Sequence, residues 1–109
     1  MEQRDGIKMN IAIDYDGTFT EDQEMWKEVM KLMKDSGHNV YCITKRYRSL
    51  GKDICESIPK GIKIIFVKTK YKIETTNRLN IKIDVWIDDQ PSTVNPVMRR
   101  FTPISRNYR

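Results

Sequence analysis

The sequence predicts an α/β domain in which helices cover a mostly parallel β-sheet. Two observations indicate this class. Apolar, strand-like runs alternate along the chain with segments that carry apolar residues at helical spacing, as in right-handed β-α-β units. Three of the four strand-like runs are also largely apolar, which is typical of parallel strands that are buried on both faces.

The first strand is expected over residues 7–14, which end on Asp14. Thr20 and Gln23 have the spacing of a capping box, so a helix is expected to begin there. Apolar residues follow at helical spacing, and Gly37 ends the helix. This stripe is expected to pack in the core, and it consists of Met25, Trp26, Val29, Met30, Leu32 and Met33.

The middle of the chain predicts a second strand and a second helix. Residues 39–44 read as a strand that ends on the hydroxyl of Thr44, and the helix after it runs to about Pro59. Its apolar face is expected to consist of Leu50, Ile54 and Ile58.

The last third of the chain predicts a third strand over residues 62–67, a short helix over 72–79 and a fourth strand over 83–88. Pro91 and Pro96 break the rest of the chain into turns. We expect the four strands to form one sheet in the order 4-1-2-3, within a single three-layer, Rossmann-like domain.

The length of 109 residues fits one domain, 1–109, with a core over about residues 7–92 and a basic C-terminal segment over 93–109. Residues 91–109 carry four arginines and no acid, and residues 60–72 carry five lysines and no acid. Such runs are either solvated surface or an electropositive approach for a phosphate-bearing substrate.

The composition, 39% hydrophobic and 32% charged, is that of an ordinary globular protein. No apolar run approaches the roughly 20 residues of a membrane span. The polar start of the chain lacks a secretory signal, so a cytoplasmic protein without a membrane partner is expected. Cys42 and Cys55 are expected to be small core residues, and the single histidine, His38, excludes a zinc site built on histidines.

Three polar residues share one placement, because Asp14, Thr44 and Asp88 each terminate an apolar strand. The carboxyl ends of parallel strands meet at one edge of the sheet, where ligands bind in α/β proteins. The sequence therefore predicts that carboxylates and a hydroxyl from separate segments meet in one crevice.

The residues at these strand ends resemble the motifs of the haloacid dehalogenase superfamily. Asp14-Tyr15-Asp16-Gly17-Thr18 is similar to its first motif, Thr44 to its second, and Asp88-Asp89 to its fourth. Its third motif is a lone lysine, for which Lys72 fits best and Lys70 and Lys82 are alternatives. The resemblance covers residues 7–92.

This resemblance implies a phosphatase that hydrolyses phosphomonoesters. Asp14 would attack phosphorus and form an aspartyl-phosphate, and Asp16 would protonate the leaving oxygen and later take a proton from water. Thr44 would donate a hydrogen bond to a phosphoryl oxygen, and Lys72 would supply positive charge. Mg²⁺ would be held by Asp14, by the backbone carbonyl of Asp16, and by Asp88 or Asp89.

The resemblance also implies how the substrate is held. Gly17 and Thr18 are expected to lie close to the substrate. From their place just after Thr44, Lys45 and Arg46 either grip a second phosphate or a base, or belong to a polar loop that caps the next helix. The gaps after Thr18 and Thr44 are too short for a cap domain, so the site is expected to be open. An open site suits a nucleotide, a nucleic-acid end or a phosphoprotein, unless a second copy of the chain or the C-terminal segment covers it.

Two other functions use similar residues. A phospho-receiver module also surrounds an aspartyl-phosphate with carboxylates, a threonine and a lysine, but it carries its acidic pair after the first strand. A binding module would hold a nucleotide in the crevice without cleaving it. A calcium loop at residues 14–18 is disfavoured, since the third acidic ligand and the glycine have the wrong spacing for an EF-hand.

Overall fold

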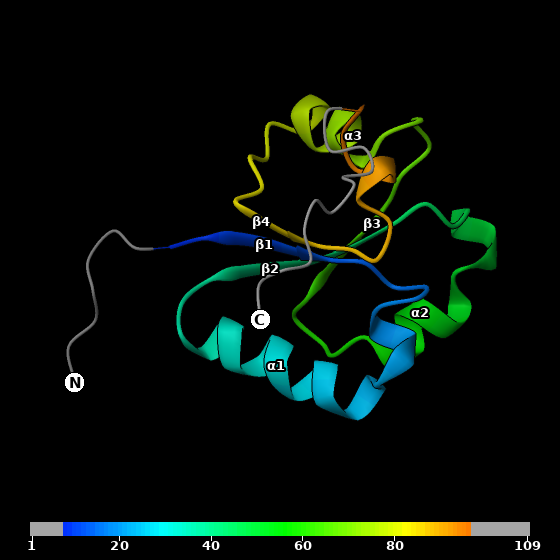
Figure 1. Ribbon diagram of the computed structural model, residues 1–109. Coiled ribbons are helices and arrows are strands. Elements are labelled where there is room, and N and C mark those ends of the chain that lie inside the picture. Colours follow the sequence, from blue (N-terminus) through cyan, green and yellow to red (C-terminus); the bar gives the residue numbers. More distant parts are fainter. Residues whose placement is uncertain (1–7, 97–109) are drawn as a thin grey trace, which may run out of the picture.

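The computed structural model describes residues 8–96, which form one four-stranded β-sheet with helices on both faces (Figure 1). All strands run parallel. Their order is β3-β2-β1-β4, which from the opposite edge reads β4-β1-β2-β3. The strands are β1 (Asn10–Ile13), β2 (Asn39–Thr44), β3 (Lys63–Phe66) and β4 (Val85–Ile87). The predicted α/β class is confirmed. Most of the expected basic C-terminal segment lies outside the described residues.

Two helices, α1 (Gln23–Asp35) and α2 (Lys52–Ser57), cover one face of the sheet, and α3 (Lys72–Arg78) covers the other (Figure 1). Because side chains alternate between the faces of a strand, each strand contributes to two cores. Ile11 and Ile13 of β1 pack in the core under α1 and α2, whereas Ala12 packs in the core on the opposite face.

The register of the sheet brings the ends of three strands together. Ile13, the last residue of β1, pairs with Cys42 of β2 and with Ile87 of β4. The backbone N–H of Asp14 continues this ladder by donating to the carbonyl of Ile87 at 3.0 Å. The residues that follow β1, β2 and β4 therefore emerge side by side at one edge.

The expected capping box at Thr20 is wrong. Thr20 lies in a 3-10 turn over Phe19–Glu21, and its hydroxyl oxygen accepts a hydrogen bond from the N–H of Gly17. Asp22 caps α1 instead, since its carboxylate accepts from the N–H of Met25 at 3.2 Å. The tight turn after β1 therefore uses the Thr20 hydroxyl, and the helix begins later than predicted.

Several residues that were expected in the core are exposed. Met25 and Leu32 of α1 lie outside the stripe that faces the sheet, where Met30 is buried. Leu50 lies in a 3-10 turn (Arg48–Leu50) before α2 and is also exposed. Cys42 is buried as expected, but Cys55 is exposed because the short helix α2 buries mainly Ile54.

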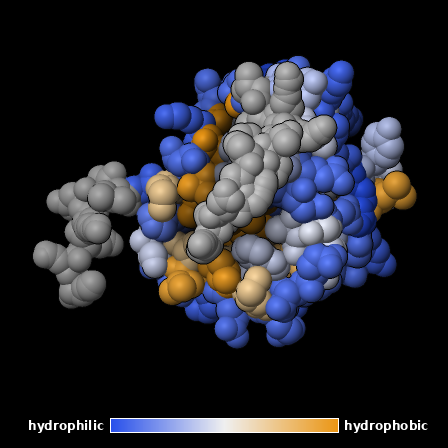
Figure 2. Space-filling model, viewed as in Figure 1, coloured by the Kyte–Doolittle hydropathy of each residue, from blue (hydrophilic) through white to orange (hydrophobic). Residues whose placement is uncertain are grey.

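In the part of the chain that the structure describes, the connections after Thr18 and Thr44 hold no inserted domain. The chain passes from Thr18 through one 3-10 turn to α1, and from β2 to α3 through the second 3-10 turn, α2 and β3. Figure 2 shows that hydrophilic residues cover much of the visible face, whereas hydrophobic residues gather towards the β4 side, where Val85 is partly exposed. Within residues 8–96, no helix has both the length and the apolar character needed to cross a membrane.

Candidate active site

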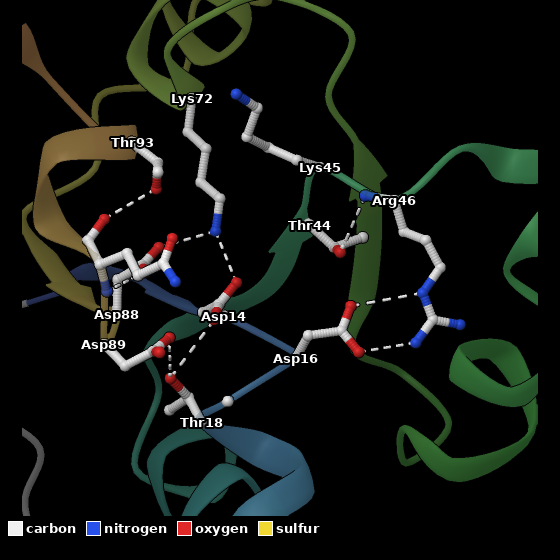
Figure 3. Close-up of polar contacts among 12 residues, drawn as sticks. Asp14, Asp16, Thr18, Thr44, Lys45, Arg46, Lys72, Asp88, Asp89 and Thr93 are labelled. Atoms are coloured by element: carbon white, nitrogen blue, oxygen red, sulfur yellow. Dashed lines mark hydrogen bonds and ion pairs between the residues drawn. The ribbon is translucent and has the colours of Figure 1, made fainter.

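Side chains from four segments meet at the carboxyl edge of the sheet, around a cavity of about 330 Å³ (Figure 3). These segments are the ends of β1, β2 and β4 and the start of α3. The cavity is lined by Asp14, Asp16, Thr44, Lys45, Arg46, Lys72, Asp88, Asp89, Gln90 and Thr93. Eight of these ten residues are predicted site residues.

Lys72 lies between two carboxylates. Its ammonium group donates to Oδ1 of Asp14 at 2.6 Å and to Oδ2 of Asp88 at 2.7 Å. Lys72 is the first residue of α3 and is only 2% exposed, so its charge is neutralised by these two ion pairs. Of the three candidate lysines, Lys72 is the one that the structure brings to the predicted carboxylates. Lys70 places its ammonium group over the ring of Tyr71 instead.

Thr18 links the two acidic clusters. Its hydroxyl lies 3.4 Å from Oδ2 of Asp14 and 3.4 Å from Oδ1 of Asp89. Gly17, with a φ of 88°, lies directly against Asp89, because a Cβ at this position would be 2.6 Å from Oδ2 of that residue. Neither Gly17 nor Thr18 lines the cavity, so their contacts favour a role in placing the carboxylates over contact with a substrate.

The carboxylates of Asp14, Asp88 and Asp89 form a group that could hold a metal ion, since each offers an oxygen within 4.8 Å of the others. Burial raises the pKa of Asp14 to about 6; Lys72 opposes this rise, while Asp88 and Asp89 add to it. Three carboxylates facing one lysine thus leave negative charge uncompensated. All three donors are oxygens, which suit a hard divalent cation. The carboxylate of Asp16 is not part of this group.

Thr44 and Lys45 follow β2 at the same edge. Thr44 is buried, and its hydroxyl oxygen accepts from the N–H of Arg46 at 3.2 Å, which leaves the hydroxyl hydrogen to be donated. The ammonium group of Lys45 donates to the carbonyl of Lys70 at 2.7 Å. This bond ties the loop after β2 to the segment that leads into α3.

Arg46 connects the cavity to α2. Its guanidinium donates to both oxygens of Asp16, at 2.7 and 3.3 Å, and to Oδ1 of Asp53 at 2.6 Å. Hydrogen bonding to Asp16 raises the pKa of Arg46, so the guanidinium stays charged. Because its guanidinium already donates to the carboxylates of Asp16 and Asp53, Arg46 is not free to bind a second phosphate, which was one role expected from the sequence.

Three residues of this site were not predicted. Gln90 and Thr93 line the cavity from the turn after Asp89, where Thr93 donates to the carbonyl of Gln90 at 2.7 Å. Asp53 does not line the cavity and is connected to it by its ion pair with Arg46. No sequence signal identifies Gln90 or Thr93, whereas the acid at position 53, in the first turn of α2, was a possible partner for the cations after Thr44.

Cys42 and His38 do not line this cavity. Burial raises the pKa of the Cys42 thiol to about 12, so it stays protonated and unreactive. His38 accepts a hydrogen bond from the N–H of Met9 at the start of β2, at the opposite edge of the sheet. The acidic side chains that line the cavity are those of Asp14, Asp16, Asp88 and Asp89.

Comparisons with known proteins add no relative. No protein-family model matches the chain, and neither a curated protein nor a solved structure matches it.

Proposed function

We propose that the chain is a Mg²⁺-dependent phosphatase that hydrolyses a phosphomonoester through an aspartyl-phosphate on Asp14. The observation that carries this proposal is the meeting of Asp14, Lys72 and Asp88 at one cavity, although 58 and 16 positions separate Lys72 from the two acids. The residue types and their placement at strand ends support the resemblance to the haloacid dehalogenase superfamily.

Asp14 is the nucleophile in this proposal. Lys72 holds one of its oxygens, while the other has only the weak contact with the Thr18 hydroxyl. An oxygen of Asp14 forms a bond to phosphorus as the bond from phosphorus to the leaving oxygen breaks. Water then attacks phosphorus and releases Asp14 and inorganic phosphate, so that one difficult displacement is divided into two easier ones.

Positive charge is needed because a carboxylate and a phosphate repel each other. Lys72 supplies one cation beside Asp14. Asp14 together with Asp88 and Asp89 would hold Mg²⁺, which would neutralise charge on the phosphoryl group. Thr44 and Lys45 line the same cavity and would contact phosphoryl oxygens or the group attached to them.

The proposed substrate class is a nucleotide or a nucleic-acid end. No inserted domain covers the cavity among residues 8–96, and about 330 Å³ is enough for a phosphate and part of the group attached to it. Lys45, which lines the cavity, favours an anionic substrate. The alternative within this proposal is that a second copy of the chain covers the open cavity.

The proposal is tested by measuring phosphate release from p-nitrophenyl phosphate in Mg²⁺ and in EDTA. We expect turnover in Mg²⁺ only, since the carboxylate cluster lacks compensating charge without the ion. A protein that accumulates a stable phosphoryl group would instead be a receiver. A protein that returns nucleotides intact from Mg²⁺ solution, with no turnover of any phosphomonoester, would be a binding module.

Gly17→Ala tests how the metal cluster is built. The added methyl group would displace the Asp89 carboxylate, and the positive φ disfavours alanine by about 1–2 kcal/mol. We expect a lower melting temperature and a smaller rise of that temperature on addition of Mg²⁺.

Gly37→Ala is the matched control, because Gly37 also has a positive φ but no atom lies within 4 Å of the position of the added carbon. It should lower the melting temperature similarly and leave the Mg²⁺ response intact. Equal Mg²⁺ responses in the two variants would contradict the role of Asp89.

A further inference from the structure

The carboxylate of Asp16 lies on the opposite side of the cavity from the Lys72 ion pairs, turned towards Arg46 (Figure 3). Arg46 binds it side-on, with Nη2 2.7 Å from Oδ1 and Nε 3.3 Å from Oδ2. Such paired hydrogen bonds fix the plane of a carboxylate as well as its position. Asp16 itself is about half exposed, so little else restrains its side chain.

The Arg46 guanidinium makes further contacts besides those with Asp16. Its Nη1 donates to Oδ1 of Asp53 at 2.6 Å and to the carbonyl of Leu50 at 2.9 Å. Its guanidinium carbon also lies 5.5 Å from the centre of the Tyr15 ring. The Arg46 side chain is only 24% exposed, although the two carboxylates that it joins are mostly in solvent. The guanidinium group at the end of this long side chain is thus fixed by contacts on two sides.

We propose that Arg46, held in place by Asp53, is a positioning residue that sets where Asp16 delivers its proton to the leaving group. This inference rests on the proposed function and adds to it two residues outside the superfamily-like motifs. Arg46 and Asp53 act through Asp16 and do not react themselves. The contacts join three segments, namely the turn after β1, the loop after β2, and α2.

The proton transfer explains which reactions need this arrangement. Asp16 is paired with Arg46 as a carboxylate, so it first takes up a proton from solvent, to which its side chain is open. As Asp14 bonds to phosphorus, the bond from phosphorus to the leaving oxygen breaks, and this proton passes from Asp16 to that oxygen. An alcohol leaves, and Asp16 becomes a carboxylate beside the Arg46 cation. In the second step, Asp16 takes a proton from the attacking water. A stable leaving anion such as p-nitrophenolate needs no proton, whereas an alkoxide does.

The test is Asp53→Ala, assayed with p-nitrophenyl phosphate and with butyl phosphate in Mg²⁺. We expect kcat/KM for butyl phosphate, which reports the step that releases the leaving group, to fall by about 10- to 100-fold, because general acid catalysis is worth about 10²–10⁴-fold and only its positioning is lost. The kcat/KM for p-nitrophenyl phosphate should fall by less than about threefold, because its leaving group needs no proton. Arg46→Met should reproduce this dependence on the leaving group.

Asp35→Ala is the matched control, since Asp35 is a similarly exposed helix residue in an ion pair, with Lys31, and does not line the cavity. It should change neither rate. Equal losses of kcat/KM with the two substrates in Asp53→Ala, or no loss with either, would overturn the inference and leave the proposed function standing. If the wild-type protein hydrolyses neither substrate, the proposed function fails and the inference fails with it.

Discussion

Asp14→Asn is expected to abolish turnover, with kcat for p-nitrophenyl phosphate falling by at least about a thousandfold. An amide oxygen is a far weaker nucleophile than a carboxylate, and the substitution also removes one negative charge from the metal cluster. Steady-state assays in Mg²⁺ measure this loss. Residual turnover within about tenfold of the wild type would exclude Asp14 as the nucleophile.

The same substitution should stabilise the fold in the absence of metal. Burial raises the pKa of Asp14 from 3.8 to about 6, so the folded state binds the proton more tightly than the unfolded state does. The free energy of unfolding therefore falls as the pH rises from about 4 to about 6, and it stays lower above that window. At pH 7 the ionised carboxylate destabilises the fold by about 2–3 kcal/mol, which Asp14→Asn should restore.

Urea denaturation in EDTA at several pH values measures this effect. The wild type and Asp14→Asn should have similar stability near pH 4 and should diverge towards pH 7. Asp35→Asn, in an exposed ion pair on α1, is the control and should show no such divergence. If Asp14→Asn is less stable than the wild type at pH 7, the ionised Asp14 carboxylate does not destabilise the metal-free fold, and this prediction is wrong.

Lys72→Met is expected to destabilise the metal-free protein by about 3–5 kcal/mol, because it leaves two buried carboxylates without their shared cation. It should also remove turnover. Mg²⁺ should recover more stability in this variant than in the wild type, since the ion then supplies the only positive charge in the cluster. Thermal and urea denaturation with and without Mg²⁺ measure both effects.

Lys70→Met is the matched control, since Lys70 lies two residues earlier, is exposed, and contacts the ring of Tyr71 and, through its carbonyl, Lys45. The free energy of unfolding of Lys70→Met should differ from that of the wild type by less than about 0.5 kcal/mol. Comparable losses in the two variants would show that the ion pairs of Lys72 contribute little. A second variant, Lys72→Met with Asp88→Asn, should regain part of the stability but none of the turnover.

Much of the site can be predicted from sequence because two simple rules determine it. Apolar runs locate the strands, and parallel strands place their carboxyl ends at one edge. These rules bring Asp14, Thr44 and Asp88 together without any knowledge of side-chain conformation. Lys72 was identified only as the best of three lysines, and its position at the first turn of α3 explains why it reaches the cluster and Lys70 does not.

The remaining features depend on competition between neighbouring side chains, which sequence patterns do not resolve. Thr20 and Asp22 are both acceptable helix caps, and the turn at Gly17 decides between them by engaging Thr20. Arg46 was identified as a cation near the site. Its partners could not be chosen from sequence, because a long, flexible side chain can reach many acids and only the packing of α2 places Asp53 beside it.

The most direct test of the central claim is to trap the phosphorylated carboxylate. The protein is mixed with substrate and Mg²⁺, denatured rapidly in acid and reduced with borohydride, which converts an aspartyl-phosphate to homoserine. Peptide mass spectrometry should then find homoserine at position 14, and only when both substrate and Mg²⁺ were present. Substrate turnover with unmodified Asp14, or with homoserine at another aspartate, would contradict the account.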